Sequence, residues 1–177
     1  MSNDHRQISE EELQVFFVLT GSGIWYLQHV EDALSKYITV KAEINERGGT
    51  SANNAKLLLS KHRKNTLGTS IRFAKERQVL DPELLAMLEA FKTERDWLVH
   101  RSLYENGDDL YLNSDRHMLL ERLNKFSEDV KRLQRLIAEE LEDFVVSKGV
   151  SRKWIHQQAM SDVNRYKGIE QAHVDCH

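Results

Sequence analysis

The sequence predicts an all-α fold, a helical bundle of about five helices, on three observations. The chain of 177 residues is 40% hydrophobic and 30% charged, which suits one compact domain. One proline and eight glycines leave little material for turns between many short strands. Apolar residues recur at three- and four-residue spacing, as on one face of a helix, and no segment shows a convincing strand pattern.

The first helix is expected to begin at a capping box. Ser9 followed by Glu12 is the pattern of such a box, and the helical segment that it opens runs to about residue 45. Gly21 and Gly23 lie inside this segment, where they either kink the helix or let another helix approach closely. Large apolar residues continue on both sides of the two glycines, which favours close approach.

Local start and stop signals mark the later elements. Gly48 and Gly49 end the first segment, and Thr50 or Ser51 caps the next helix. We expect helices at 52–64, at 69–78 after a break, from 82 to about 104 behind an Asp-Pro start, from about 114 to 149, and after Ser151, with a turn at 105–109. These form one domain at 9–167, between an N-terminal tail at 1–8 and a flexible C-terminal tail at 168–177.

The charge of the chain is unevenly distributed. The net charge is −3, so bulk charge does not make the protein a general polyanion binder. Residues 41–77 nevertheless hold nine Lys/Arg against three Asp/Glu. This basic middle is either a phosphate-binding surface or a solvated face paired with acidic neighbours. Within it, Lys61, Arg63 and Lys64 are the best candidates for contacts with a nucleic-acid backbone.

Cysteine usage and hydropathy indicate a cytoplasmic protein that does not enter a membrane. Cys176 is the only cysteine, so there is no disulfide framework and no metal-binding cysteine pair. The N-terminus is acidic where a secretory signal would be basic, and polar residues interrupt the most apolar run, at 13–30. His173, Cys176 and His177 form at most an incidental binder in the tail, so we expect no metal site and no cofactor.

Arg95 lies in the middle of an apolar stripe of the helix expected from residue 82. At about 100° per residue, this arginine falls within about 60° of the directions of its apolar neighbours on the helix, Leu84, Leu88, Phe91, Leu98 and Val99. A guanidinium stays charged, so its burial costs several kcal/mol unless it is paired. Another face carries Asp96, His100 and Tyr104 one turn apart. One interpretation is structural: Arg95 pairs with a carboxylate of another helix, and His100 is a hydrogen-bonded interfacial residue.

The other interpretation follows from the spacing of Arg95 and His100. Four residues separate them near the end of a helix, which resembles the Arg-x4–6-His signature of HEPN domains (the higher eukaryote and prokaryote nucleotide-binding family). The family motif commonly reads Arg-Asn-x-x-x-His, and residues 94–101 here read ERDWLVHR. The resemblance covers about residues 10–146, including a leading pair of helices and a long helix after the motif helix.

The resemblance implies a metal-independent endoribonuclease that acts on RNA. Members of the family often have this activity, and they are dimers whose two motifs face each other. Arg95 and His100 would then be the catalytic pair at a composite site of a homodimer. An imidazole can transfer protons near neutral pH, and a guanidinium presents a planar fork to phosphate oxygens. The resemblance further implies a bacterial toxin–antitoxin or defence system, with a cognate antitoxin protein as a partner.

Two positions depart from the family pattern. Asp96 replaces the usual asparagine, so it either adds negative charge near a phosphate site or orients His100. In members paired with a nucleotidyltransferase antitoxin, a tyrosine follows the histidine by two positions; here that residue is Ser102, and Tyr104 lies four positions on. We assign auxiliary roles to Asp96 and Tyr104, and we add Arg101 to the RNA-binding residues.

Other functions stay open on the sequence alone. The chain is alternatively a non-catalytic helical adaptor, or a helical regulator that binds nucleic acid without cutting it. Catalysis requires that Arg95 and His100 both reach a cleft, whereas an adaptor tolerates their burial. The aromatic residues Trp25, Tyr26 and Trp154 are expected in the core or at an interface. His117 and Glu121, one turn apart, are expected to face solvent.

Overall fold

The computed structural model describes residues 6–168, and every regular element in this range is helical. The prediction of an all-α fold is confirmed. The elements are α1 (Glu10–Ile38), the π-helix η1 (Thr39–Ile44), α2 (Ala52–His62), α3 (Leu67–Glu76), α4 (Pro82–His100), α5 (Ser102–Asn106), the 3-10 helix η2 (Asp108–Tyr111), α6 (Asn113–Ser147) and α7 (Arg152–Tyr166).

The predicted helix starts are formed by side-chain caps. The hydroxyl of Ser9 accepts a hydrogen bond from the backbone N–H of Glu12 at 3.2 Å, and the Glu12 carboxylate accepts one from the Ser9 N–H at 2.9 Å. Asp81 accepts from the N–H of Glu83 at 2.8 Å, with Pro82 at the first helical position. Each cap satisfies N–H groups that the first helical turn leaves without partners.

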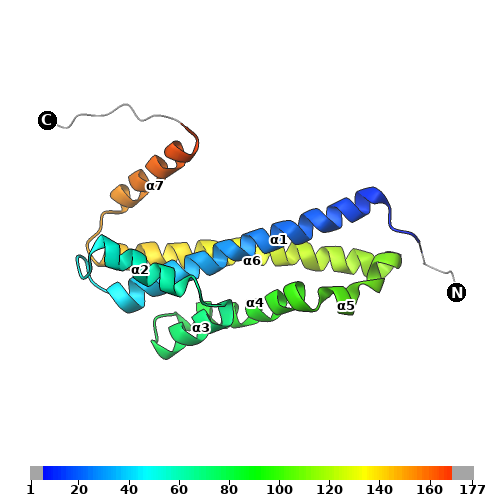
Figure 1. The fold of residues 1–177 in the computed structure, drawn as a ribbon, viewed down its shortest axis with the longest axis horizontal. Coiled ribbons are helices and arrows are strands. Elements are labelled where there is room, and N and C mark those ends of the chain that lie inside the picture. Colours follow the sequence, from blue (N-terminus) through cyan, green and yellow to red (C-terminus); the bar gives the residue numbers. More distant parts are fainter. Residues whose placement is uncertain (1–5, 169–177) are drawn as a thin grey trace.

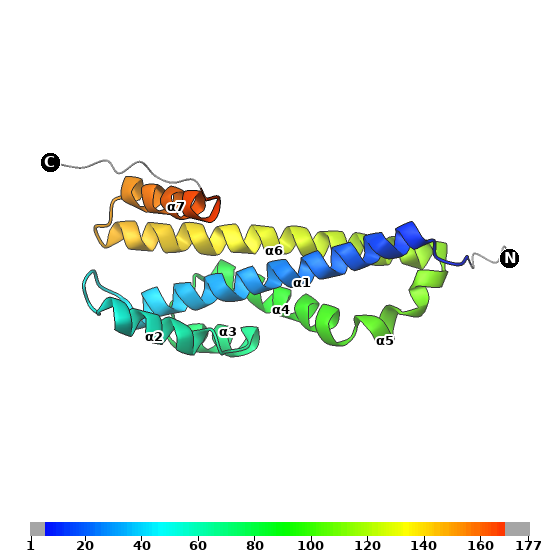
Figure 2. The ribbon, with the colours of Figure 1, turned by 45° about the horizontal axis from the view of Figure 1, so that its top comes forward.

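Two long helices, α1 and α6, form the centre of the molecule and run in the same direction (Figures 1 and 2). Near one end, the Arg6 guanidinium donates to Asn113 at 3.1 Å; further along, the Tyr37 hydroxyl lies 2.7 Å from Glu140. Helix α4 packs against both in the opposite direction. Helices α2 and α3 cover the C-terminal half of α1, and α7 packs against α6.

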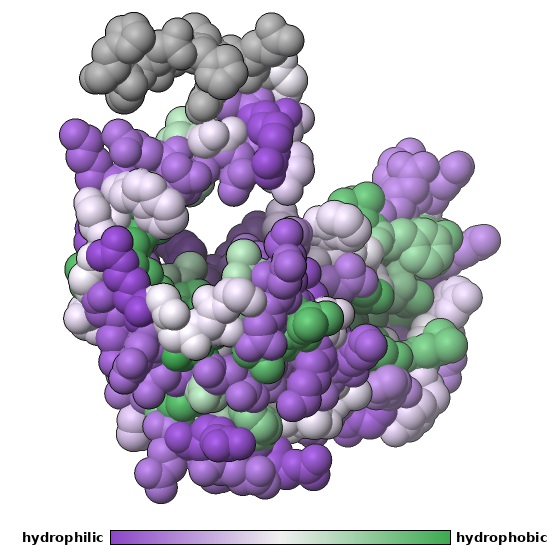
Figure 3. Space-filling model, turned by 60° about the vertical axis from the view of Figure 1, so that its left-hand side comes forward, coloured by the Kyte–Doolittle hydropathy of each residue, from purple (hydrophilic) through white to green (hydrophobic). Residues whose placement is uncertain are grey.

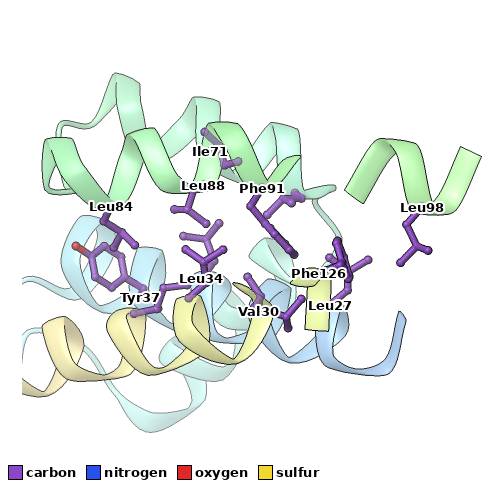
Figure 4. Close-up of a cluster of buried hydrophobic side chains, with 14 of the residues drawn as sticks. Leu27, Val30, Leu34, Tyr37, Ile71, Leu84, Leu88, Phe91, Leu98 and Phe126 are labelled. Atoms are coloured by element: carbon purple, nitrogen blue, oxygen red, sulfur yellow. The ribbon is translucent and has the colours of Figure 1, made fainter. Parts of the chain in front are cut away.

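The face shown in Figure 3 is mostly hydrophilic, with hydrophobic side chains exposed in places. The core lies where α1, α3, α4 and α6 meet, and Leu34 and Leu88 point into it (Figure 4). Leu34, Leu88, Val130 and Ile137 are completely inaccessible to solvent. Burying a side chain of this size contributes about 1.5–3 kcal/mol. Gly23 is part of this packing, because an added Cβ would lie 3.3 Å from Phe126 and 3.4 Å from Leu98. The close approach predicted for the glycines is confirmed at Gly23, whereas Gly21 faces open space.

The predicted end of the first segment, at about residue 45, is confirmed: the segment becomes a π-helix at Thr39 and ends at Asn45, whose φ of 54° is left-handed. Residues 6–168 form seven α-helices instead of about five, and one boundary is wrong. The motif helix ends at His100 rather than near Tyr104. Trp25 and Trp154 are 62% and 55% exposed, so neither is a core residue.

The helices are more polar than membrane-spanning segments. Within residues 6–168, none of them combines the length and hydropathy that crossing a membrane requires. Of the two predicted tails, residues 1–5 and 169–177 lie outside the described part of the chain. Arg6, which falls in the predicted N-terminal tail, is held by its backbone N–H to the Tyr111 carbonyl at 3.0 Å.

Candidate functional site

The end of α4 brings Arg95, Asp96 and His100 together. Nη1 of Arg95 lies 3.1 Å from Oδ1 of Asp96 and 3.4 Å from Nε2 of His100. The Arg95 side chain is 20% exposed, and His100 is exposed. A guanidinium nitrogen only donates hydrogen bonds, so Nε2 of His100 is the acceptor in this contact. The predicted pair is therefore in direct contact within one chain.

Arg95 is positioned by the apolar residues on either side of it. Phe91, one turn earlier, and Leu98, one turn later, are 5% and 4% exposed. Leu98 contacts α1 at Gly23, which brings this part of α4 close to α1. The stem of Arg95 follows the same face, and its Nε is buried with no hydrogen-bond partner among the described residues. The guanidinium therefore lies at the border of the core, with its Nε buried and the side chain as a whole 20% exposed.

Glu31 of α1 faces Arg95, and the sequence analysis did not identify it. Its Oε1 lies 3.5 Å from Nη2 of Arg95. The two groups form an ion pair, but this length is at the limit for a hydrogen bond, and Oε1 is buried without a donor. Burial raises the pKa of Glu31, and the charge of Arg95 opposes this only in part. The structural interpretation of Arg95, pairing with a carboxylate of another helix, therefore has a named partner.

Asp96 is bound to two cations of its own helix. It accepts hydrogen bonds from Lys92 at 2.7 Å and from Arg95 at 3.1 Å. The hydrogen bond from Lys92, followed by that from Arg95, holds the pKa of Asp96 below its usual value. Among the described residues, Asp96 makes no hydrogen bond to His100, and Arg95 lies in contact with both side chains.

The helix break after His100 removes Tyr104 from the site. Arg101 has a φ of −125° and a ψ of −22°, and the chain then starts the separate helix α5. Tyr104 is 73% exposed and its hydroxyl donates to Glu105 at 3.4 Å. Arg101 pairs with the same carboxylate at 3.2 Å. The placement of Tyr104 on the face of His100 assumed an unbroken helix and is wrong.

Trp97 explains where the helix breaks. Its ring is completely buried, and its indole N–H donates to Asn106 at 2.8 Å. The guanidinium of Arg122, from α6, lies 3.6 Å from the centre of the ring, a cation–π contact. These contacts hold α5 against α4 and α6, so they fix the backbone that follows His100. An isolated tryptophan in a helical pattern does not reveal this role.

The basic segment is only partly free to bind a phosphate. Arg63 pairs with Asp32 of α1 through a 2.6 Å hydrogen bond, whereas Lys61 and Lys64 are exposed and make no ion pair within residues 6–168. Burial disfavours ionisation of Asp32, yet Lys36 and Arg63 hold its pKa below the usual value. Glu31 and Asp32 are adjacent on α1, so two neighbouring carboxylates there bind cations of α4 and of the basic segment.

His62, in the middle of the basic segment, is a structural residue. Its side chain is 1% exposed, its Nε2 lies 3.2 Å from Glu43 of η1, and its ring packs against Phe73 of α3 at 5.1 Å. This contact holds α2 against η1 and α3. With His62 pointing into the protein, Lys61 and Lys64 point to other sides of this turn of the chain, and both are exposed.

Exposed apolar residues surround the end of α4. Phe17, Leu98 and Leu103 line a pocket of about 210 Å³ between α1, α4, α5 and α6. Phe17 and Leu103 are 61% and 84% exposed. Val18 and Trp25 of α1 are also exposed, at 65% and 62%, but they do not line this pocket. Exposed apolar side chains beside a pocket are typical of surfaces that contact another protein.

The described residues contain no group of three or more His, Cys, Asp or Glu side chains suited to a metal ion. The tail residues His173, Cys176 and His177 lie outside the described part. His117 and Glu121 form an exposed pair at 3.2 Å on α6. Comparison of the chain with protein-family models, with curated proteins and with solved structures finds no match.

Proposed function

We propose that the protein is a metal-independent endoribonuclease of the HEPN type, with Arg95 and His100 as its catalytic pair. The observation that carries the proposal is the 3.4 Å contact between the Arg95 guanidinium and the His100 imidazole at the solvent edge of α4. A fixed cation beside a proton acceptor is the combination that cleavage of RNA through its 2′-hydroxyl requires.

The proposed reaction uses the two side chains in sequence. A phosphodiester accepts hydrogen bonds from Arg95, which then no longer occupies Nε2 of His100. This nitrogen takes the proton of the 2′-hydroxyl, and the O2′–P bond forms as the P–O5′ bond breaks. The leaving O5′ receives a proton from a second acid, and Arg95 stabilises the charge that develops on the phosphate oxygens. The products are a 2′,3′-cyclic phosphate and a 5′-hydroxyl.

The second acid is proposed to come from a second copy of the chain. One chain presents one histidine at the end of α4, and a two-fold axis there would add a second histidine and a second arginine to the same cleft. The exposed apolar residues Phe17 and Leu103, which line the pocket near Leu98, are suited to such a homodimer interface, and the exposed Trp25 of α1 could extend it.

Lys61 and Lys64 are proposed to bind the RNA backbone at a distance from the chemistry. They are the cations of the predicted set that make no ion pair within residues 6–168, whereas Arg63 and Arg101 already bind Asp32 and Glu105. On the family resemblance, we further propose that the protein is cytoplasmic and acts in a toxin–antitoxin or defence system. Its partner there would be a cognate antitoxin protein.

A second candidate function is a non-catalytic helical adaptor or nucleic-acid-binding regulator. The ion pairs of Arg95 with Glu31 and Asp96 favour it, because a guanidinium held by two carboxylates is not free for a phosphate. In this case Arg95 serves the fold, and its loss lowers stability without affecting any reaction.

RNA cleavage in the presence of EDTA separates the two functions. The endoribonuclease produces fragments that end in 2′,3′-cyclic phosphate, and a substrate whose 2′-hydroxyls are methylated is left intact. A His117→Ala variant is a matched control for His100→Ala, because the His117 side chain is exposed and lies on α6, away from the motif. No cleavage by the wild type would favour the adaptor, and cleavage of the methylated RNA at the same rate would refute the 2′-hydroxyl mechanism.

A further inference from the structure

In the ion pair between Arg95 and Glu31, each side chain has a buried polar atom that makes no hydrogen bond within residues 6–168. Nε of Arg95 and Oε1 of Glu31 are buried, and neither has a hydrogen-bond partner among the described residues. Nη2 of Arg95 is 3.5 Å from the same carboxylate oxygen. A guanidinium and a carboxylate in good register form two parallel hydrogen bonds of about 2.7–2.9 Å. The observed pair has the charges of such an arrangement without its geometry.

The remaining contacts of Arg95 keep it in this position. Nη1 donates to Asp96 on one side and to His100 on the other, at 3.1 and 3.4 Å. Asp96 is itself bound by Lys92. Two carboxylates and an imidazole therefore surround the guanidinium, and of the two carboxylates only Glu31 comes from another helix.

We propose that Glu31 is a positioning residue that holds Arg95 in the resting protein and is replaced on the guanidinium by a phosphodiester oxygen of the ligand. This inference rests on the proposed function, because it assigns the ligand of Arg95 as the RNA backbone. A tetrahedral phosphate offers several acceptor oxygens and can satisfy Nε and Nη2 together, which the carboxylate does not do.

The surroundings of Glu31 support an exchange rather than a permanent pair. The carboxylate is half-buried, and burial raises its pKa more than Arg95 lowers it, so the contact does not fully compensate for the desolvation of ionised Glu31. Asp32, the next residue, is occupied by Arg63 and Lys36 and does not take the place of Glu31. When a phosphate displaces Glu31, Nη2 becomes free for the anion, while the hydrogen bond from Nη1 to Asp96 keeps the guanidinium at the end of α4.

Glu31→Gln isolates this role, since glutamine keeps the shape of the side chain and removes its charge. The probe is inorganic phosphate at constant ionic strength, and the signal is the NMR resonance of the Arg95 Nε–H, assigned by its loss in Arg95→Lys. We expect the resonance to shift in both proteins as the Nε–H gains an acceptor, with half-saturation at about fivefold lower phosphate in Glu31→Gln, the effect of an interaction of a partly exposed charge.

Glu89→Gln is the matched control. It removes the same charge from α4, where Glu89 forms an exposed ion pair with Lys75 of α3, and the half-saturating phosphate concentration should stay at the wild-type value. Equal phosphate dependence in wild type and Glu31→Gln, an equal gain in Glu89→Gln, or no shift of the Arg95 resonance in any protein would overturn the inference.

A second arm separates this inference from the proposed function. An RNA oligomer with methylated 2′-hydroxyls cannot be cleaved by 2′-oxygen attack, but it retains the phosphodiesters. A shift of the Arg95 resonance by the oligomer, again at lower concentration in Glu31→Gln, supports both. A Glu31 effect with inorganic phosphate alone upholds the exchange and refutes RNA as the ligand. Absence of RNA cleavage with both effects present refutes only the catalytic step.

Discussion

Replacement of Arg95 by alanine should lower stability through Glu31. A fully buried ion pair that loses one partner costs about 3–5 kcal/mol, and an exposed pair about 0–1 kcal/mol. Arg95 and Glu31 are 20% and 30% exposed, and no hydrogen bond joins them, so we expect about 2 kcal/mol from stranding Glu31. Removal of the unpaired Nε donor offsets about 1 kcal/mol of this cost. The expected net loss is about 1 kcal/mol, or about 2–4 °C in Tm.

The double-mutant cycle with Glu31→Gln identifies the source of this loss. In the Glu31→Gln background no carboxylate is stranded, so Arg95→Ala should cost less than about 0.5 kcal/mol. The assay is urea unfolding at pH 7 followed by circular dichroism for the four proteins of the cycle. A loss of about 3–5 kcal/mol in the wild-type background would show that Arg95 serves the fold. Equal losses in both backgrounds would show that Glu31 is not its partner.

Three further predictions concern other residues of the site. Glu31→Gln should be more stable than wild type at pH 7 in urea unfolding, and this advantage should disappear as the pH falls towards 4.5. Burial raises the folded-state pKa of Glu31, so the stability that protonated Glu31 contributes to the wild type is lost as the pH rises through that value. An advantage of Glu31→Gln that grew on acidification would contradict this. Replacing Lys61 and Lys64 by alanine should weaken RNA binding in a fluorescence titration and reduce the slope of log K against log salt by about 2, without changing cleavage at saturating RNA. Light scattering at about 50 μM should detect a dimer, and Trp25→Asp should convert it to a monomer with an unchanged helical spectrum.

Local signals in the sequence were sufficient to predict the helix starts. Ser9 and Glu12 form their capping box within four residues, and Asp81 with Pro82 starts α4 in the same way. The break after His100 could not be predicted from such signals. It depends on Trp97, which is held by Asn106 and Arg122 from two other helices. Tyr104 was misplaced for this reason.

The candidate site was also predicted only in part, because local spacing identifies residues on one helix but not their partners on other helices. The motif spacing singled out Arg95 and His100, but helix geometry places the two on different faces; the structure nevertheless brings their side chains into contact. Glu31 faces Arg95 only because α1 packs against α4 at Gly23 and Leu98. The partner of Arg63 is equally a consequence of packing, since Asp32 belongs to α1. Contacts between helices determine which cations of the site are free.

The most direct test of the account is the rate of RNA cleavage in EDTA by wild type, Arg95→Ala, His100→Ala and the control His117→Ala. Loss of the charge-stabilising guanidinium should reduce the rate by about 10²–10³-fold. Loss of the proton acceptor should reduce it by about 10²–10⁴-fold. His117→Ala should cut at the wild-type rate. Cleavage by Arg95→Ala or His100→Ala at the wild-type rate would contradict the assignment of these two residues as the catalytic pair.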